Sequence, residues 1–527
     1  MRDFALPRRS PAFAGEAMAA TSHPLATLAA LDTLRAGGNA VDAAICAAAV
    51  LAVAEPHMTG VGGDCFVLYS KQGGLPIALN GSGRAPMKAT PEWYHAQGIR
   101  AIQVESPHAV TIPGAVDAWL TLLADHGSRE IGELLRPAIK LAEEGCVVTP
   151  RVGFDFRFEG DKPRRDPATA KVFAPGGRTL VAGDRIRNPA LAETFRRIAR
   201  EGRRGFYEGP VAADIVARMK ELGGLHELED FALQHAEYVA PISAPYRGVE
   251  VFECPPNGQG LAALIILRIL AGYDLAGDKY SEADRIHLLA EASKAGALRR
   301  DTLIGDPRFV ATPVERLLSD AHAEKARAGI RLDRAGEPVE WDGPEHKDTV
   351  YFCIVDRDGN AISFINSLFH DLGSGIMAPK SGVLLQSRGT SFQLDPRHPN
   401  CIAPGKRPMH TIIPGMAVKD GKAAMPFGVM GGHYQCVGHA HLLSHMLDRG
   451  LDPQQALETP RSFAFSGALL LEHTVGQTVG ADLARRGHHI VWPEKPLGGG
   501  QAIWIDRARG VLIGGSDPRK DGFAAGY

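Results

Sequence analysis

Residues 348–367 read DTVYFCIVDRDGNAISFINS. The run 350–355 is rich in β-branched and aromatic residues, which favours a strand. Asp358-Gly359 is a strong signal for a tight turn, because glycine accepts positive φ without steric cost. The chain then returns as a second apolar run over 361–367. The stretch therefore predicts a β-hairpin.

A small hydroxyl residue stands at the open end of this hairpin. A two-residue turn sets Thr349 opposite Leu368, with Ser367 beside it, to within about one residue of register. If the bond between Asp348 and Thr349 were cut, Thr349 would carry a free amine that can act as base for its own hydroxyl. Thr with an N-terminal amine is a known activated nucleophile. Most Asp-Thr pairs before a strand are ordinary strand starts, so the interpretation needs support from the rest of the chain.

The composition is that of a soluble globular enzyme. The 527 residues allow more than one domain and a large buried core, and 45% hydrophobic with 22% charged residues are ordinary values. The net charge of −2 gives no electrostatic reason to expect binding to nucleic acid or to an anionic membrane. We therefore expect a small-molecule substrate, and neither a nucleic-acid partner nor a membrane.

Three features predict a cytoplasmic location. Residues 1–14 lack the continuous apolar segment of a secretory signal. The apolar run 40–54 is too short to span a bilayer and is predicted as a buried helix. The seven cysteines are odd in number and scattered, with no paired framework, which indicates a reducing compartment.

Periodic apolar patterns predict helices up to Thr349 and a strand-rich region after it. The segment 331–346 is polar and rich in glycine and proline, so it is predicted as a loop or linker just before Thr349. The predicted helices cover residues 24–35, 40–54, 113–123, 131–143, 191–201, 211–221, 260–271, 281–304 and 438–448.

The stretch that begins at Asp348-Thr349 resembles the start of the small subunit in the gamma-glutamyltransferase family, whose members are N-terminal nucleophile hydrolases. Further matches occur along nearly the whole chain. No single match decides the assignment, but their order and spacing together are specific to this family. They include Gly37–Ala44, Glu55–His57, Gly60–Gly63, Pro245–Gly248, Pro255-Pro256, Gly260, Gly305–Pro307, Gly373–Ile376, Lys406–Pro408, Gly431-Gly432, Ser516–Arg519 and Ala525–Tyr527.

The resemblance implies an α/β fold, a four-layer α/β/β/α sandwich with antiparallel sheets between helical layers. It also implies self-cleavage between Asp348 and Thr349. The large piece (residues 1–348) and the small piece (residues 349–527) would form a heterodimer that shares one intertwined fold, and further dimerisation stays open. No cofactor is expected.

The resemblance also assigns the catalytic residues. Thr349 is the nucleophile, both for self-cleavage and for the substrate. Ser367 matches a position whose hydroxyl hydrogen-bonds the nucleophile; the family usually has Thr there, with the same donor and acceptor groups. Gly431 and Gly432 match the oxyanion hole, where glycine lets a backbone N–H approach a developing oxyanion.

The substrate pocket departs from that of the gamma-glutamyl enzymes. Their Arg for the glutamyl α-carboxylate aligns with Ser82, and Arg84, two residues later, is a candidate replacement. A family Asn is replaced by Phe369, a Gln by Arg388, and the Asp that pairs with the α-amine by Ser391. Two Ser of the family are replaced by His410 and Thr411.

These replacements change what the pocket can bind. A desolvated α-ammonium needs a carboxylate partner, and Ser391 supplies none. Arg388 adds a planar fork suited to a carboxylate. We therefore predict an acyl group that bears an acid but no α-amine, as the resemblance to the oxamate amidohydrolase-like branch also implies. His433, which follows Gly432, is predicted as a further pocket residue.

A dense group of metal-ligand residue types follows the glycine pair, but no metal is expected. His441 and His445 stand one helical turn apart and lack the Glu of a zinc protease motif. The other members, Cys436 and His439, are expected to line or cap a helix.

Three alternatives to the oxamate-like hydrolase stay open. One is a glutathione hydrolase or gamma-glutamyltransferase, which the altered pocket disfavours. Another is an acylase for larger groups such as glutaryl, which Phe369 and a short segment from Ser391 to Lys406 leave open. The third, from a different class, is an unprocessed binding protein without catalytic activity.

Overall fold

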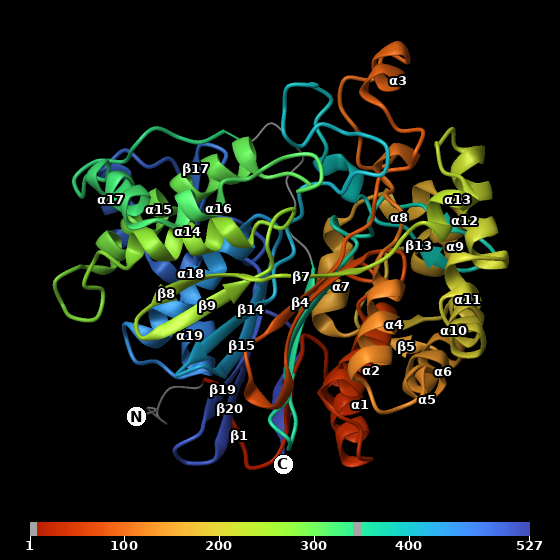
Figure 1. Cartoon of the computed structure of the whole chain (residues 1–527), viewed down its shortest axis with the longest axis horizontal. Coiled ribbons are helices and arrows are strands. Elements are labelled where there is room, and N and C mark those ends of the chain that lie inside the picture. The colour runs from red at the N-terminus through yellow and green to blue at the C-terminus, as the bar shows by residue number, and fades with distance from the viewer. Residues whose placement is uncertain (1–7, 341–348) are drawn as a thin grey trace.

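The computed structural model describes residues 8–340 and 349–527. Two seven-stranded antiparallel sheets lie face to face at the centre, and helices cover the outer face of each (Figure 1). The order of layers is α/β/β/α, which confirms the predicted fold class.

The first sheet contains the predicted hairpin at its centre. Its strand order is β21 (Ala524–Gly526), β2 (Met18–Ala20), β10 (Val350–Val355), β11 (Ala361–Ser367), β3 (Asp64–Ser70), β4 (Ile77–Gly81) and β7 (Glu237–Val239). The helical layer against it is centred on α2, every residue of which is buried. This layer contains α1 (Pro24–Arg35), α2 (Ala40–Ala54), α4 (Ala115–His126), α5 (Ile131–Leu134), α6 (Arg136–Glu144), α10 (Pro189–Glu201) and α12 (Pro210–Glu221).

The second sheet has the order β1 (Ala12–Ala14), β20 (Val511–Ser516), β19 (Gly499–Asp506), β15 (Lys422–Met430), β14 (Gly415–Lys419), β9 (Val249–Glu253) and β8 (Ile242–Tyr246). Its outer face packs on α14 (Gly260–Leu270), α15 (Glu282–Leu303), α18 (Tyr434–Leu447) and α19 (Pro453–Glu458).

Shorter elements surround this sandwich. They are α3 (Pro91–Ala96), α7 (Pro150–Phe158), α8 (Lys162–Arg165), α9 (Pro167–Phe173), α11 (Arg204–Tyr207), α13 (Leu228–Ala232), α16 (Val314–Leu318), α17 (Asp320–Ala328), α20 (Gln477–Arg485), β5 (Cys146–Val147), β6 (Arg185–Ile186), β12 (Met377–Ala378), β13 (Val383–Leu384), β16 (Ser462–Phe465), β17 (Ala468–Leu471) and β18 (Ile490–Val491).

An apolar core fills the space between the two sheets. Phe66 and Tyr351 from the first sheet pack with Met416, Met430 and Ile503 from the second, and all five are buried. Alternation along each strand sends one set of side chains into this core and the other set towards the helices. Since both faces of β10 and β11 are covered, all thirteen of their residues are buried, as the continuous apolar runs in the sequence indicate.

The register of the hairpin differs by one residue from the predicted pairing, which is within the error of about one residue given for it. Val350 pairs with Asn366 and Val355 with Ala361, so extension of the ladder sets Thr349 opposite Ser367 instead of Leu368. The cause is the turn, which spans residues 357–359 and ends with Gly359 at a φ of 77°. Three-residue loops of this kind, with glycine in the left-handed region, are common in hairpins.

Both sheets combine strands from the two sides of Thr349. β10 and β11 lie between β2 and β3, which come from the first hundred residues. In the second sheet, β8 and β9 pair onto β14. Neither sheet is complete without both sides of the chain, so the division at Thr349 stays a prediction about covalent connectivity and does not separate two independently formed domains.

The helix predictions are accurate where glycine and capping residues mark the ends. α1 and α2 have the predicted bounds, and Asn39 caps α2 through hydrogen bonds from Val41 and Asp42. The single helix predicted over 131–143 is two helices, since the chain breaks just before Pro137, where an i→i−4 hydrogen bond cannot form. α18 begins at Tyr434, four residues before its predicted start.

Along the described ranges 8–340 and 349–527, none of the helices combines the length and apolar content needed to cross a bilayer.

Asp356 joins the hairpin turn to the start of α2, and its replacement should destabilise both. Its buried carboxylate accepts hydrogen bonds from the backbone N–H groups of Ala40, Asp358 and Asn360 and from the Asn360 side chain, at 2.8–3.0 Å. Asp356→Ala leaves these donors unpaired, which costs about 3 kcal/mol. We expect a thermal midpoint several degrees lower by calorimetry, whereas Asp358→Ala, at an exposed turn position, leaves the midpoint nearly unchanged. Equal midpoints for the two variants would contradict this assignment.

Candidate active site

Thr349 lies at the start of β10 with its side chain fully buried. Its Oγ1 is 3.2 Å from Ser367 Oγ, at the end of the neighbouring strand β11. The backbone N–H of Phe369 donates to Ser367 Oγ at 2.9 Å, which leaves the Ser367 proton available for Thr349. The corrected register therefore brings together the two hydroxyls that the sequence predicts as partners. Asp348 lies outside the described residues, and the position of the cleavage stays a prediction.

The predicted oxyanion loop joins β15 to α18. Gly431 and Gly432 have φ values of 120° and 60°, which side-chain-bearing residues rarely adopt. A Cβ on Gly431 would lie 3.0 Å from Gly498 Cα, so that position also lacks space for a side chain. The loop therefore requires glycine on steric grounds, which is compatible with the predicted oxyanion role.

Two buried glutamines that the sequence did not single out hold this loop. Gln259 Nε2 donates to the carbonyl oxygens of Thr411 at 2.6 Å and Gly432 at 2.9 Å. Gln435, in the first turn of α18, contacts Thr349 through its side chain. No sequence signal reveals these residues, because a buried amide gains its role only from partners that folding brings close.

Arg388 is the most unusual charge in the site. It lies on a 3₁₀-helix (Arg388–Ser391) and is fully buried. Its Nη1 donates to Thr411 Oγ1 at 2.9 Å, and its Cζ stacks 3.9 Å from the centre of the Phe369 ring. Within the described part of the chain, Nε and Nη2 have no hydrogen-bond partner. Burial lowers the pKa of the guanidinium to about 9, while the charge of Asp64 acts in the opposite direction.

Phe369 supports this stacked arrangement at a cost in backbone energy. Its φ of 84° is rare for a bulky residue and costs on the order of 1–3 kcal/mol. Its ring also packs edge-on against His370, with centres 4.5 Å apart. Residues in such conformations gather at functional sites, where the surrounding structure holds them.

The other predicted pocket residues fall into two groups. Ser391 Oγ is buried and has no hydrogen-bond partner among the described residues. His410, in contrast, is engaged at both ring nitrogens: Nε2 donates to Asp64 Oδ2 at 3.0 Å and Nδ1 accepts from the Ile412 N–H at 3.3 Å. Burial lowers the pKa of His410 to about 3, with a further contribution from Arg388, so the ring is neutral. Direct substrate contact by His410 stays a prediction that these contacts do not favour.

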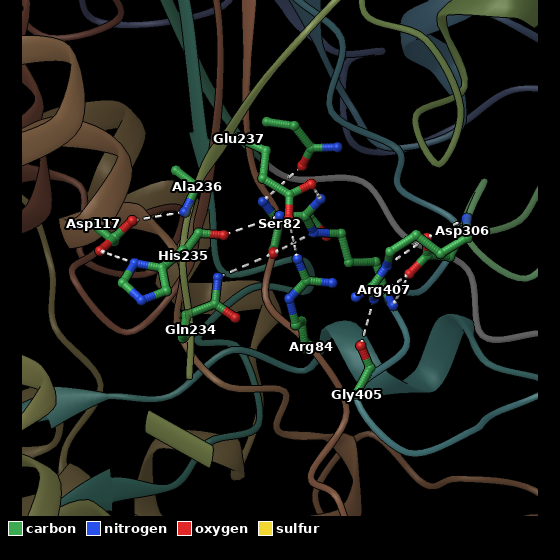
Figure 2. Close-up of polar contacts among 12 residues, drawn as sticks. Ser82, Arg84, Asp117, Gln234, His235, Ala236, Glu237, Asp306, Gly405 and Arg407 are labelled. Atoms are coloured by element: carbon green, nitrogen blue, oxygen red, sulfur yellow. Dashed lines mark hydrogen bonds and ion pairs between the residues drawn. The ribbon is translucent and has the colours of Figure 1, made fainter. Parts of the chain in front are cut away.

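Arg84 is paired with Glu237, in a cluster that also holds Arg407 (Figure 2). Arg407 Nη1 binds the second oxygen of Glu237 at 2.8 Å, and Arg407 Nε donates to the Ser82 carbonyl at 3.2 Å. Glu237 is shared between Arg84 and Arg407, and Arg84 Nη1 has no hydrogen-bond partner in the described chain, so the role of Arg84 as the replacement for the family's carboxylate-binding Arg stays a prediction.

His433 is buried after the oxyanion loop and stacks on Phe465 with ring centres 5.5 Å apart. Burial, and then the nearby charge of Arg300, lowers its pKa well below the ordinary value of 6.5. The lowered pKa favours the neutral ring, which in a pocket would supply hydrogen bonds rather than charge.

Histidines of α18 contact other side chains of the protein. His439 Nδ1 contacts Glu253 at 2.6 Å, and His441 Nε2 contacts Thr459 at 2.7 Å. A different set of metal-ligand residue types, His287, Glu291 and His488, lies together elsewhere in the described chain. His287 and His488 hydrogen-bond each other at 2.8 Å, and Lys294 pairs with Glu291 at 2.8 Å. These mutual contacts, and the ammonium group beside the carboxylate, do not fit a bound cation.

The chain is similar along nearly its whole length to proteins of one family. The family model described as Gamma-glutamyltranspeptidase matches residues 26–527. The chain belongs to the gamma-glutamyltranspeptidase family. This confirms the resemblance that the motifs predict.

Three relatives illustrate the range of this family. The glutathione hydrolase-like YwrD proenzyme of Bacillus subtilis (strain 168) is 37% identical over 521 residues, which cover 97% of this chain and 98% of that protein. The oxamate amidohydrolase proenzyme of Klebsiella pneumoniae subsp. pneumoniae is 35% identical, with 97% and 98% of the two chains covered. The crystal structure of cephalosporin acylase from Bacillus halodurans has 40% identity and a TM-score of 0.93, covering 100% of this chain and 99% of that one.

Membership in this family, together with the shared fold, makes the chain a self-processing amide hydrolase of the N-terminal nucleophile type. Its relatives are proenzymes, which implies that the mature form is a heterodimer of its own two pieces. The unprocessed binding protein is thereby disfavoured. The substrate and the roles of the individual site residues stay predictions.

Self-cleavage and turnover should depend on the hydroxyl group at position 367 more than on the size of the side chain. Ser367→Ala removes the hydrogen bond to Thr349 Oγ1, so we expect self-cleavage and turnover to fall about 10- to 100-fold. Ser367→Thr keeps the hydroxyl and should retain most of both rates. Intact mass spectrometry over time follows the cleavage, and a Ser367→Ala variant that matures at the wild-type rate would contradict the assignment.

Proposed function

We propose that the protein hydrolyses the amide of a small acyl group that bears a carboxylate and no α-amine, with oxamate as the model substrate. Thr349, freed by cleavage after Asp348, is the nucleophile. Neighbouring groups have the roles that the family resemblance gives them: Ser367 as hydrogen-bond partner, and Gly431 and Gly432 as oxyanion donors.

The observation that carries this proposal is the unmatched charge of Arg388. A buried guanidinium is costly unless it is paired and its donors are satisfied. Here one nitrogen binds the neutral Thr411 hydroxyl, and Nε and Nη2 have no partner in the described chain. A carboxylate accepts two parallel N–H bonds from such a fork. The missing partner is therefore best supplied by an acid group of the substrate.

The same pocket is poorly suited to a gamma-glutamyl group. The α-ammonium of that group needs a carboxylate, and Ser391 offers only a hydroxyl. Ser391 Oγ also lacks a partner in the described chain, so it is available to accept or donate a neutral hydrogen bond. Among the relatives, oxamate amidohydrolase acts on a small acid amide, in keeping with this chemistry. Glutathione hydrolysis and acylase activity are the alternatives that the other relatives suggest.

The reaction that we propose uses only groups of this chain. Thr349 Oγ1 attacks the amide carbonyl and its proton passes to the Thr349 amine. The backbone N–H groups of the glycine loop stabilise the oxyanion, and each donor contributes about 3–4 kcal/mol. The C–N bond breaks and ammonia or an amine leaves with the proton. Water then hydrolyses the acyl-threonine ester and releases the acid.

We also propose a reducing, cytoplasmic location, which is supported by the cysteines. All seven are buried and unpaired. Desolvation raises the pKa of several of these thiols, for example that of Cys46 to about 11, so they are unreactive as thiolates.

The substrate proposal is tested by measuring ammonia release from oxamate and related acid amides. Wild-type protein should turn over the acid amides, and Thr349→Ala should neither mature nor react. Arg388→Met should raise KM for acid amides about 100-fold, the loss of two charge-assisted hydrogen bonds. No release from any acid amide, with rapid turnover of a gamma-glutamyl anilide or a glutaryl amide, would replace this proposal by one of its alternatives.

The pH dependence provides a second test of Arg388. Burial lowers the pKa of its guanidinium to about 9, which predicts a loss of charge at alkaline pH that an ordinary arginine does not show. Because kcat/KM reports the free enzyme, kcat/KM for an acid amide should fall as the pH rises through about 9. An amide without a carboxylate, measured in parallel, should not show this decline. A flat profile for the acid amide through the same range would argue against Arg388 as the binding group.

A further inference from the structure

Gln435 lies fully buried in the first turn of α18, three residues after Gly432. Its Nε2 donates to Thr349 Oγ1 over 3.4 Å. From this contact we infer that Gln435 is a further catalytic residue, whose amide N–H stabilises the negative charge that develops on the nucleophile oxygen. The inference rests on the proposed role of Thr349 and adds to it a second hydrogen-bond donor.

The orientation of the Gln435 amide follows from its other contact. The backbone N–H of Ile413 points at Gln435 Oε1 at 3.0 Å. A flipped amide would set its NH₂ against this N–H and leave both without an acceptor. The oxygen therefore faces Ile413, and the NH₂ group faces Thr349.

Two donors can then converge on Thr349 Oγ1. Ser367 Oγ accepts from the Phe369 N–H, so its own proton can be given to Thr349 over 3.2 Å. Gln435 supplies the other donor from the opposite element, α18. Neither contact needs the Thr349 proton, which stays available for transfer to the amine. Hydrogen bonds of this kind are often long before substrate binds and shorten as charge develops.

Gln435 also links the nucleophile to the oxyanion loop. Its backbone N–H donates to the Gly432 carbonyl at 3.2 Å, and Gln259 Nε2 donates to the same oxygen at 2.9 Å. One residue thus contacts both the attacking atom and the loop that stabilises the carbonyl oxygen. A helix terminus that packs on the second sheet holds both in place.

The Gln435 amide N–H stabilises Thr349 Oγ1 in every step in which that oxygen carries negative charge. In acylation, the O–H proton passes to the Thr349 amine while the C–O bond forms. In deacylation, water adds to the ester carbon and gives a proton to that amine; the C–Oγ1 bond then breaks, and Oγ1 takes the proton back. Oγ1 carries partial negative charge in both steps. A hydrogen bond to a charged atom is stronger than one to a neutral atom, so its loss slows both steps about 10- to 100-fold.

Gln435→Glu tests the hydrogen-bond donor alone, because it removes the donor to Thr349 and keeps the acceptor for Ile413. A carboxylate keeps the length of the side chain and still accepts from Ile413, but it cannot donate to Thr349. We expect kcat for the best acid amide to fall about 10- to 100-fold with KM changed less than about 3-fold. Gln435→Met, which removes donor and acceptor, should be slowed at least as much.

The pH profile separates catalysis from a purely structural role. Burial raises the pKa of a carboxyl group, and the protonated form donates a hydrogen bond again. The ratio of Gln435→Glu to wild-type kcat should therefore rise as the pH is lowered, whereas the ratio for Gln435→Met should stay flat.

Gln454→Glu is the matched control. Gln454 is also a buried amide, bound to Glu458 and Ser516, and its replacement should leave kcat near the wild-type value.

If Gln435→Glu accumulates as the precursor, its rate of self-cleavage at each pH replaces kcat, because the same Oγ1 attacks in that step. Wild-type rates for both Gln435 variants, or equal losses with no pH-dependent recovery of Gln435→Glu, would overturn the inference. The proposed substrate fails separately, if wild-type protein cleaves itself and hydrolyses no acid amide; self-cleavage then still tests Gln435.

Discussion

Ser367 ends β11 beside Thr349, which directly precedes β10, and the three-residue turn at the other end of the hairpin makes the two hydroxyls meet. Asp356 holds that turn against the start of α2 through four hydrogen bonds. A shift of one residue would turn every side chain of β10 to the opposite face, and Thr349 with them. The proposed nucleophile is therefore positioned by the buried centre of the first sheet, where burial on both faces fixes the register.

The buried charge of Arg388 is a second constraint, and in the proposed function it acts on the substrate. Asp64 is a charge of opposite sign, but its oxygens accept from the N–H groups of Gly83 and Gly114, from Gln386 and from His410. His410 is neutral and contacts Asp64, so the carboxylate influences Arg388 without pairing with it. The protein thus keeps the guanidinium charged at neutral pH and leaves two of its nitrogens without a partner in the described chain. Such a group discriminates strongly between ligands with and without an acid.

The sequence predicts the layers, the hairpin and the meeting of Thr349 with Ser367, because each depends on local patterns or on motifs of adjacent residues; the catalytic roles of this pair and of Gly431 and Gly432 stay predictions. It places the turn one residue wrong, since Asp-Gly suits both two-residue and three-residue loops. It identifies neither Gln259 nor Gln435, whose partners lie up to 173 positions away. For Arg84 the sequence suggests a pocket residue but gives no sign of its ion pair with Glu237, 153 positions further on, and its role stays a prediction.

The proposed nucleophile lies beside the sheet and the proposed binding residues lie outside the strands, an arrangement that would allow one catalytic pair to serve different acyl groups. Thr349 directly precedes β10 and Ser367 ends β11, two central strands that are buried on both faces, so their geometry tolerates little change. Arg388 and Ser391 lie on a short 3₁₀-helix, and His410 and Thr411 lie in a segment outside the strands. Binding residues carried by loops on a rigid scaffold can be exchanged at small cost in folding energy. The relatives named for glutathione, oxamate and cephalosporin share this chain's length and fold, as expected if substitutions in the loops, with the sheets retained, select the acyl group.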